Sequence, residues 1–335
     1  MFRSCTSIPV RVIALKEEKF QTAKHEIESV AQFSDVKMWQ GIRGKDLFDE
    51  NTNVLPNHKE ILAQKYPHAH FDLADDENIL STQAELSLSS KQRTNLYDLH
   101  NAGAIGCSLS HISLWQHMVD NDIPVMMIFE DDVLFENRFK NGTANVEKEL
   151  NCILNEFSLN FDVLNLNLCP IPSVLVHGTK LTDSRLKNVV FVEGIAFRTQ
   201  GYIITLEGAK QLLKNAFPLL HVIDSYMTLL TVLPSSKNHY IYLATKLPWL
   251  IHPTLEITGK SSIGYDAFTT IVDGVLFLPR WSIFAMIGVC FLSLVAAFVL
   301  AIVVICLTQK GKKIQVETKY NRKKKDKFYR SLTRF

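Results

Sequence analysis

Three adjacent carboxylates, Glu130, Asp131 and Asp132, directly follow a continuous apolar run at residues 125–129. Such a run is typical of a strand that is buried on both faces of a parallel sheet. Because ligands of open α/β sheets bind beyond the carboxyl ends of the strands, the triplet is expected in a ligand crevice. Three like charges this close repel one another, and a divalent cation is the simplest compensation. Oxygen ligands of this kind favour Mg²⁺ or Mn²⁺ held together with substrate phosphates, although the triplet alone also fits a solvated acidic turn.

The segments that must position this triplet alternate between strand and helix patterns. Residues 8–15 form an apolar, β-branched run, and a charged, helix-favouring segment follows them. Apolar residues at spacings of three and four predict an amphipathic helix over 104–119, shortly before the apolar strand. Other patterns predict strands at 36–39, 161–168, 189–197 and 201–205, a helix at 206–215 and an irregular insertion at 50–95. The alternation indicates an α/β fold of the Rossmann-like kind.

The composition of the 335 residues, 47% hydrophobic and 21% charged, is that of a folded protein with a substantial core. Residues 308–335 contain eleven Lys or Arg and two acidic residues, a net charge of +9, so the formal +2 of the chain leaves −7 for the rest. An acidic folded part argues against nucleic acid as a partner, because phosphate binding requires a cationic face. The six cysteines include no C-x-x-C pair, which favours small buried residues over a disulfide framework or a zinc site.

A charge-free segment of twenty-six residues, 282–307, exceeds the roughly 20 residues that a helix needs to cross a bilayer. Arg280 and Trp281 on one side and three lysines on the other are the interfacial anchors expected of a single transmembrane helix. The chain is therefore predicted to contain a domain at 1–270, a connector at 271–281, the membrane helix and a basic tail at 308–335.

Two rules disagree about the side of the membrane on which the domain lies. The positive-inside rule places the basic tail in the cytosol, whereas a lone C-terminal anchor leaves residues 1–281 there. The N-terminal apolar stretch is too short for the hydrophobic region of a signal peptide. The absence of a signal pattern and of a disulfide pattern favours a cytosolic domain.

A longer pattern surrounds the triplet. It begins with the run from Ala102 to His111, continues with Leu114 and Trp115, and ends with the apolar strand and its carboxylates. This combination resembles the signature of glycosyltransferase family 25, which includes lipooligosaccharide and collagen β-galactosyltransferases. The resemblance extends over about residues 8–265, with further matching segments at 12–15, 39–44, 162–168, 201–205, 208–209, 212–213 and 223–224. It implies a GT-A fold, a nucleotide-sugar donor such as UDP-galactose, and transfer with inversion.

The resemblance and the chemistry of a diphosphate leaving group together suggest roles for five residues. Asp132 is the first choice as a ligand of Mn²⁺ or Mg²⁺, with Glu130 beside it as a ligand or a supporting group. Asp131 would contact the ribose or the donor sugar, and Asp224 is the candidate base for the acceptor hydroxyl. Arg43 would hold a phosphate. The alternative interpretations are a helix N-cap for Asp224 and a simple surface position for Arg43.

The leading prediction is a membrane-anchored enzyme that moves a hexose, with galactose as first choice, from a UDP-sugar to a glycan, a lipid-linked glycan or a glycoprotein. One alternative is a catalytically lapsed GT-fold membrane protein that serves as an interaction platform, which departures from the family pattern at residues 16–19 and Gln40 permit. Another is a metal-dependent hydrolase that uses the same triplet. His111 is expected to be a buried structural histidine, and Ser110 to bond a carbonyl within its own helix.

Overall fold

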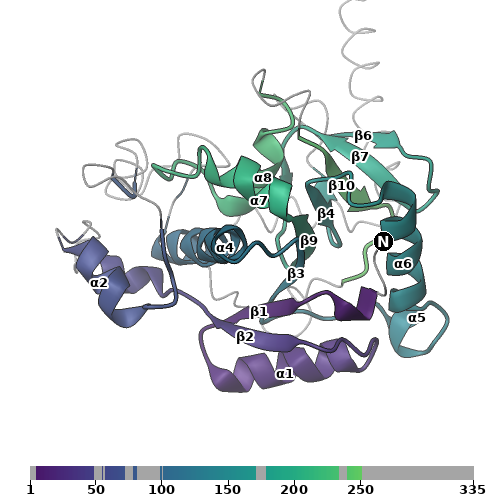
Figure 1. The fold of residues 1–335 in the computed structure, drawn as a ribbon, viewed down its shortest axis with the longest axis horizontal. Helices are drawn as coiled ribbons and strands as arrows, with labels where there is room; N and C mark the ends of the chain where they lie inside the picture. The colour runs from purple at the N-terminus through teal and green to yellow at the C-terminus, as the bar shows by residue number, and fades with distance from the viewer. Residues whose placement is uncertain are drawn as a thin grey trace, which may run out of the picture. The chain divides into compact units, whose positions relative to one another are not determined.

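A mixed eight-stranded sheet forms the centre of the computed structural model, in the strand order β2-β1-β3-β9-β4-β10-β7-β6 (Figure 1). The structure describes residues 5–48, 55, 57–71, 78–80, 99, 101–170, 179–233 and 240–250. The predicted membrane helix, connector and basic tail lie outside these residues and stay predictions. Within the described part of the chain, no helix is both long and apolar enough to span a membrane.

The first three strands form the parallel part of the sheet. β1 (Val10–Ala14) lies between β2 (Val36–Gln40) and β3 (Val125–Glu130) and runs parallel to both. The register pairs Ile13 with Glu130, so the end of β3 lies beside the end of β1. The acidic triplet therefore begins at the carboxyl edge of the parallel strands, as its position in the sequence predicts.

The remaining strands mix directions. β9 (Gly201–Thr205) lies antiparallel between β3 and β4 (Val163–Asn165). β10 (Tyr242–Thr245) runs parallel to β4 and antiparallel to β7 (Val189–Glu193), which pairs with the edge strand β6 (Lys180–Asp183). A separate two-stranded sheet joins β5 (Cys169–Pro170) to β8 (Ala196–Phe197).

Two apolar cores cover the two faces of the sheet, and β3 contributes to both. Met126 and Ile128 point into the core that contains α4 (Ala102–Asp120), α7 (Leu206–Leu213) and α8 (Ile223–Leu229). Val125, Met127 and Phe129 point into the core that contains α1 (Glu17–Glu28) and α6 (Val146–Phe157). All five side chains are buried, which explains why β3 is a continuous apolar run rather than an alternating one.

Side chains at the start of several helices accept hydrogen bonds from free backbone N–H groups. Asn101 caps α4 by accepting from the Ala104 N–H, Asn145 caps α6, and Thr205 caps α7 directly after β9. The shorter elements are η1 (Cys5–Ser7), η2 (Gly44–Leu47), α2 (His58–Lys65) and α5 (Asn137–Lys140).

Two predicted strands have other boundaries in the structure. The strand expected at 161–168 is only the three residues of β4, although the flanking residues Asp162 and Leu166 still bond to the backbone at the ends of β9 and β10. The strand expected at 189–197 is interrupted at Gly194, whose φ of +101° separates β7 from β8. The segment 50–95, expected to be irregular with only short helical hints, contains the eight-residue helix α2 in its described part.

Candidate active site

Helix α4 packs against the loop between β2 and η2 at contact distances that only glycine allows. A Cβ atom on Gly106 would lie 2.4 Å from the Ile42 carbonyl oxygen, and one on Gly44 would lie 1.7 Å from the Ala102 carbonyl oxygen. Ser110 Oγ donates to the Gly106 carbonyl at 2.6 Å, as the sequence predicted, and also accepts the Ile42 N–H at 2.8 Å. These contacts fix the helix that presents Cys107 and His111.

A buried polar network joins α4 to β9. The phenol oxygen of Tyr202 accepts the Trp115 indole N–H at 2.9 Å and lies 2.8 Å from His111 Nδ1. All three side chains are fully buried. The imidazole ring is thus held by its Nδ1 atom, and its other nitrogen points out of the network. The predicted burial of His111 is confirmed, but its Nε2 atom has no hydrogen bond among the described residues.

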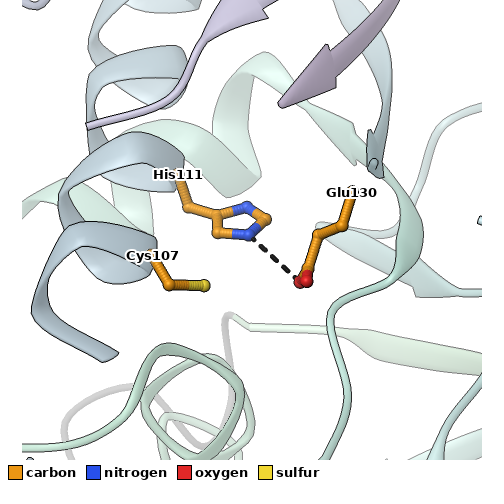
Figure 2. Close-up of side chains that lie close together, drawn as sticks. All are labelled: Cys107, His111 and Glu130. Carbon is orange, nitrogen blue, oxygen red and sulfur yellow. Dashed lines mark ion pairs between the residues drawn. The ribbon is translucent and has the colours of Figure 1, made fainter. Parts of the chain in front are cut away.

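Cys107, His111 and Glu130 converge where α4 passes the end of β3 (Figure 2). His111 Nε2 lies 3.5 Å from Glu130 Oε1, and the sulfur, nitrogen and oxygen atoms of the three residues all lie within 4.8 Å of one another. His111 and Cys107 are four residues apart on one helix and therefore share a face. The group pairs a soft sulfur and an imidazole with a carboxylate, all of which can bind metal ions.

The backbone segment 198–200 holds Glu130 from the opposite side. Thr199 Oγ1 donates to Glu130 Oε1 at 2.5 Å, and the Glu130 N–H donates to the Gln200 carbonyl at 3.0 Å. Arg198 adopts φ of +83°, a left-handed conformation that is uncommon for a residue with a side chain. Its carbonyl accepts a hydrogen bond from the Asn165 side chain at 2.8 Å. Glu130 is consequently a positioned carboxylate, only 19% exposed.

Asp131 and Asp132 occupy the turn that follows β3 and are less confined. Loss of solvation and the negative charge of Glu130 raise the pKa of Asp131, while Lys19 in the first turn of α1 and the backbone at Leu15 act in the opposite direction. Asp132 is exposed at the surface. The protein packed around its carboxyl group, followed by the charge of Glu130, nevertheless raises the pKa of Asp132 to about 7.

Asp224 joins this group from α8. Its carboxylate oxygens accept the Arg198 N–H at 3.0 Å and the Ser225 N–H at 2.7 Å. Burial raises its pKa, the two N–H groups lower it, and the charge of Glu130 raises it further. Val222, not Asp224, is the N-cap residue of α8, so the alternative interpretation of Asp224 as an N-cap is wrong. The side chain instead holds the left-handed backbone of Arg198.

The structure thus brings four of the five predicted site residues together. Glu130, Asp224, Asp132 and Asp131 all act electrostatically on Cys107, whose pKa burial and these charges raise well above its usual value. Arg43 is exposed on its loop, where its N–H donates to the Tyr66 hydroxyl at 2.9 Å. No ion pair between Arg43 and the four carboxylates is found among the described residues, so its phosphate role stays a prediction.

Several residues of the site were missed by the sequence analysis. Cys107 lies four residues before His111 in a predicted helix, and this spacing was the available signal. The pairing of β9 with β3 brings Thr199, Gln200 and Tyr202 close to Glu130. No local sequence pattern predicts this pairing. Carboxylate oxygens are ligands that a hard divalent cation favours.

The fold and the site define a Rossmann-like α/β domain with a cluster of carboxylates at the carboxyl edge of its parallel strands. The model of "Glycosyltransferase family 25 (LPS biosynthesis protein)" matches residues 12–227, and the chain belongs to this family of glycosyltransferases. The matched range contains all five predicted site residues and the whole Cys107, His111 and Glu130 group.

Relatives from several animals share this domain. Procollagen galactosyltransferase 2 of Homo sapiens is 27% identical over 188 residues, which are 53% of this chain and 29% of the relative. Procollagen galactosyltransferase 1-A of Xenopus laevis is 30% identical over 51% of this chain and 28% of its own length. Probable inactive glycosyltransferase 25 family member 3 of Rattus norvegicus is 32% identical over 34% of this chain and 18% of its own length. The chain thus matches less than a third of each relative.

Proposed function

We propose that this chain transfers a hexose, with galactose as the first candidate, from a UDP-sugar to a hydroxyl group of a glycan, a lipid-linked glycan or a glycoprotein. The catalytic domain has the GT-A form of the α/β fold, and transfer inverts the anomeric centre. Membership of glycosyltransferase family 25 and similarity to procollagen galactosyltransferases support the reaction class. The single observation that carries the proposal is the convergence of Asp224 with Glu130, Asp131 and Asp132 at one edge of the sheet.

The donor would bind on the side formed by β1 and β3. Asp132 and Glu130 are the carboxylates that would hold Mn²⁺ or Mg²⁺, and such a cation neutralises the negative charge that develops on the diphosphate. Asp131 interacts with the backbone at Leu15, in the loop between β1 and α1, and with Lys19 in the first turn of α1. Open α/β sheets bind nucleotides at this kind of loop. Asp131 would bind the ribose or the donor sugar there, and Arg43 would bind a phosphate.

Asp224 would act as the base. Its carboxylate is fixed by two backbone N–H groups, and its raised pKa favours proton uptake. The acceptor oxygen forms a bond to the anomeric carbon as the bond from that carbon to the diphosphate oxygen breaks. The bonding electrons leave with UDP, and the hydroxyl proton passes to Asp224. One displacement of this kind inverts the anomeric centre.

A donor-consumption assay with a panel of UDP-sugars, with and without Mn²⁺, tests the proposal on the full chain. We expect cation-dependent release of UDP with one preferred sugar, and loss of this release in Asp132→Asn. Asp183→Asn, which changes an exposed carboxylate on β6, is the matched control and keeps the activity. Absence of release for every sugar would favour the interaction platform. Release that no acceptor accelerates, with free hexose as the only product, would favour the hydrolase.

We further propose that residues 282–307 anchor the chain in a membrane and that the catalytic domain faces the cytosol. The charge-free length of this segment supports the anchor, and six cysteines without a disulfide pattern favour the cytosolic side. Protease treatment of intact microsomes should digest the domain. A protected domain with a clipped tail would contradict the proposal, as would an N-glycan on Asn141, which is exposed in the sequence Asn-Gly-Thr.

A further inference from the structure

We propose that Cys107, His111 and Glu130 form a binding site for a borderline-soft divalent cation, with Zn²⁺ as the first candidate. This site goes beyond the transferase function, because it requires neither a sugar nucleotide nor an acceptor. It also differs in chemistry from the oxygen ligands expected to hold Mn²⁺ or Mg²⁺ at Asp132. The absence of a C-x-x-C pair had argued against zinc, but this ligand set combines a helical pair with a strand end.

The distances between the three side chains are close to those of a metal site. Tetrahedral zinc, with bonds of about 2.0 to 2.3 Å, separates neighbouring ligand atoms by about 3.5 Å. His111 Nε2 and Glu130 Oε1 are already 3.5 Å apart. The largest separation in the group is 4.8 Å or less, so a side-chain movement on the order of 1 Å would complete the geometry.

His111 supplies an independent indication of a ligand. It is fully buried, and its Nε2 atom has no hydrogen bond among the described residues, although it faces Glu130 and Cys107 (Figure 2). Its Nδ1 atom is fixed by Tyr202, which Trp115 fixes in turn. Metal-binding histidines characteristically bond through one nitrogen while a neighbour holds the other. Binding through Nε2 places the ring proton on Nδ1, where the Tyr202 oxygen accepts it.

The ligand types select the metal. A thiolate and an imidazole beside a carboxylate are the ligand types of zinc, whereas Mg²⁺ and Mn²⁺ favour oxygen ligands. Binding releases the Cys107 proton to solvent and leaves the thiolate on the cation, so the step involves no oxidation. Because Glu130 belongs to both ligand sets, a zinc ion held by Cys107 and His111 would draw Glu130 away from a cation at Asp132.

Zinc binding to the full chain can be measured by competition with a chromogenic chelator. We expect one Zn²⁺ per chain, an affinity about 100-fold lower in Cys107→Ser and His111→Asn, and an affinity about 10-fold lower in Tyr202→Phe. Cys152→Ser and His117→Asn are matched controls, because Cys152 is an exposed thiol on α6 and His117 lies on the same helix as His111. Both controls should bind zinc like the unmodified chain.

Cobalt provides a second readout that needs no variant. Co²⁺ bound to the unmodified chain should show a thiolate charge-transfer band in the near ultraviolet. No zinc binding, no such band, or zinc binding unchanged in both Cys107→Ser and His111→Asn would overturn the proposal. Transferase activity is not part of the test. An inactive chain that binds zinc through Cys107 would therefore refute the transferase and leave the zinc site intact.

Discussion

The acidic site has two sides that the protein treats differently. Glu130 and Asp224 are held by hydrogen bonds from Thr199, from the Arg198 backbone and from the Ser225 backbone. Asp131 and Asp132 lie in the turn after β3, where the pKa of Asp132 is raised to about 7. Glu130 and Asp224, the held side, are therefore positioned without a ligand, whereas Asp131 and Asp132 form the open side. On the open side, loss of solvation and the charge of Glu130 raise the pKa of both Asp131 and Asp132, and a bound cation would relieve the repulsion between these charges.

The largest effect on activity is expected from removing a charge on the open side, at Asp132. Asp132→Asn should lower cation-dependent transfer about 1,000-fold, because it removes one negative charge from the cation ligands without changing the side-chain shape. Steady-state turnover over a range of Mn²⁺ concentrations measures the loss, and circular dichroism checks the fold. Full turnover with unchanged cation dependence would refute the assignment of Asp132.

The next effect concerns the held side. Asp224→Asn should lower kcat about 100-fold while donor affinity changes little, since a base acts on the acceptor proton in the transition state. Turnover and donor binding by calorimetry separate the two quantities. A drop in thermal midpoint with normal kcat would instead show that Asp224 only holds the backbone of Arg198.

A third prediction concerns the pH dependence of Mn²⁺ binding on the open side, which follows from the pKa of Asp132. Because this pKa is about 7, Mn²⁺ affinity should fall up to tenfold per unit as pH drops below about 7, and should level off above it. Mn²⁺ binding followed by electron paramagnetic resonance gives the profile, and Asp132→Asn should flatten it.

The same pKa fixes the sign of the stability effect. A folded-state pKa above the unfolded value means that the folded protein binds the proton more tightly. The metal-free protein should therefore lose stability as pH rises from about 4 through about 7. Urea unfolding across this range would show the trend. A stability that instead rises over the range would contradict the crowding of charge at Asp132.

The smallest effect is expected from loosening the held side. Thr199→Val keeps the side-chain shape but removes the hydrogen bond to Glu130, and should lower the free energy of unfolding by about 1 to 2 kcal/mol. Urea unfolding measures it. Thr182→Val on the exposed strand β6 is the control and should change stability by only a few tenths of a kcal/mol. Equal effects from both changes would mean that Glu130 is not held by Thr199.

The sequence predicted those parts of the fold that local patterns determine. The helix expected at 104–119 is Ala102–Asp120, the strand expected at 125–129 is Val125–Glu130, and the strand expected at 201–205 is matched in full. Each is a long apolar run or a regular helical spacing with a clear end. The acidic triplet was likewise placed correctly at the edge of the sheet.

The rest depends on contacts between distant segments. Asp224 was selected by family resemblance, but its bond to the Arg198 backbone follows from the packing of α8 beside the segment 198–200. The insertion of β9 next to β3 brings Thr199 and Tyr202 to Glu130, and a single sequence carries no record of that pairing. The Cys107 and His111 pair was visible as a helical spacing, but its third member comes from another element.

The strand order also determines when the domain can fold. β9 lies between β3 and β4, although it is made after both, and β10 later enters between β4 and β7. A nascent chain that ends before Gly201 therefore leaves one edge of the apolar strand Val125–Glu130 without its partner. An unpaired strand edge readily forms hydrogen bonds with other chains. The partly made protein is therefore prone to aggregate until β9 has been made and has paired with β3. The acidic group is likewise incomplete until α8 has been made, because Asp224 joins Glu130, Asp131 and Asp132 from that helix.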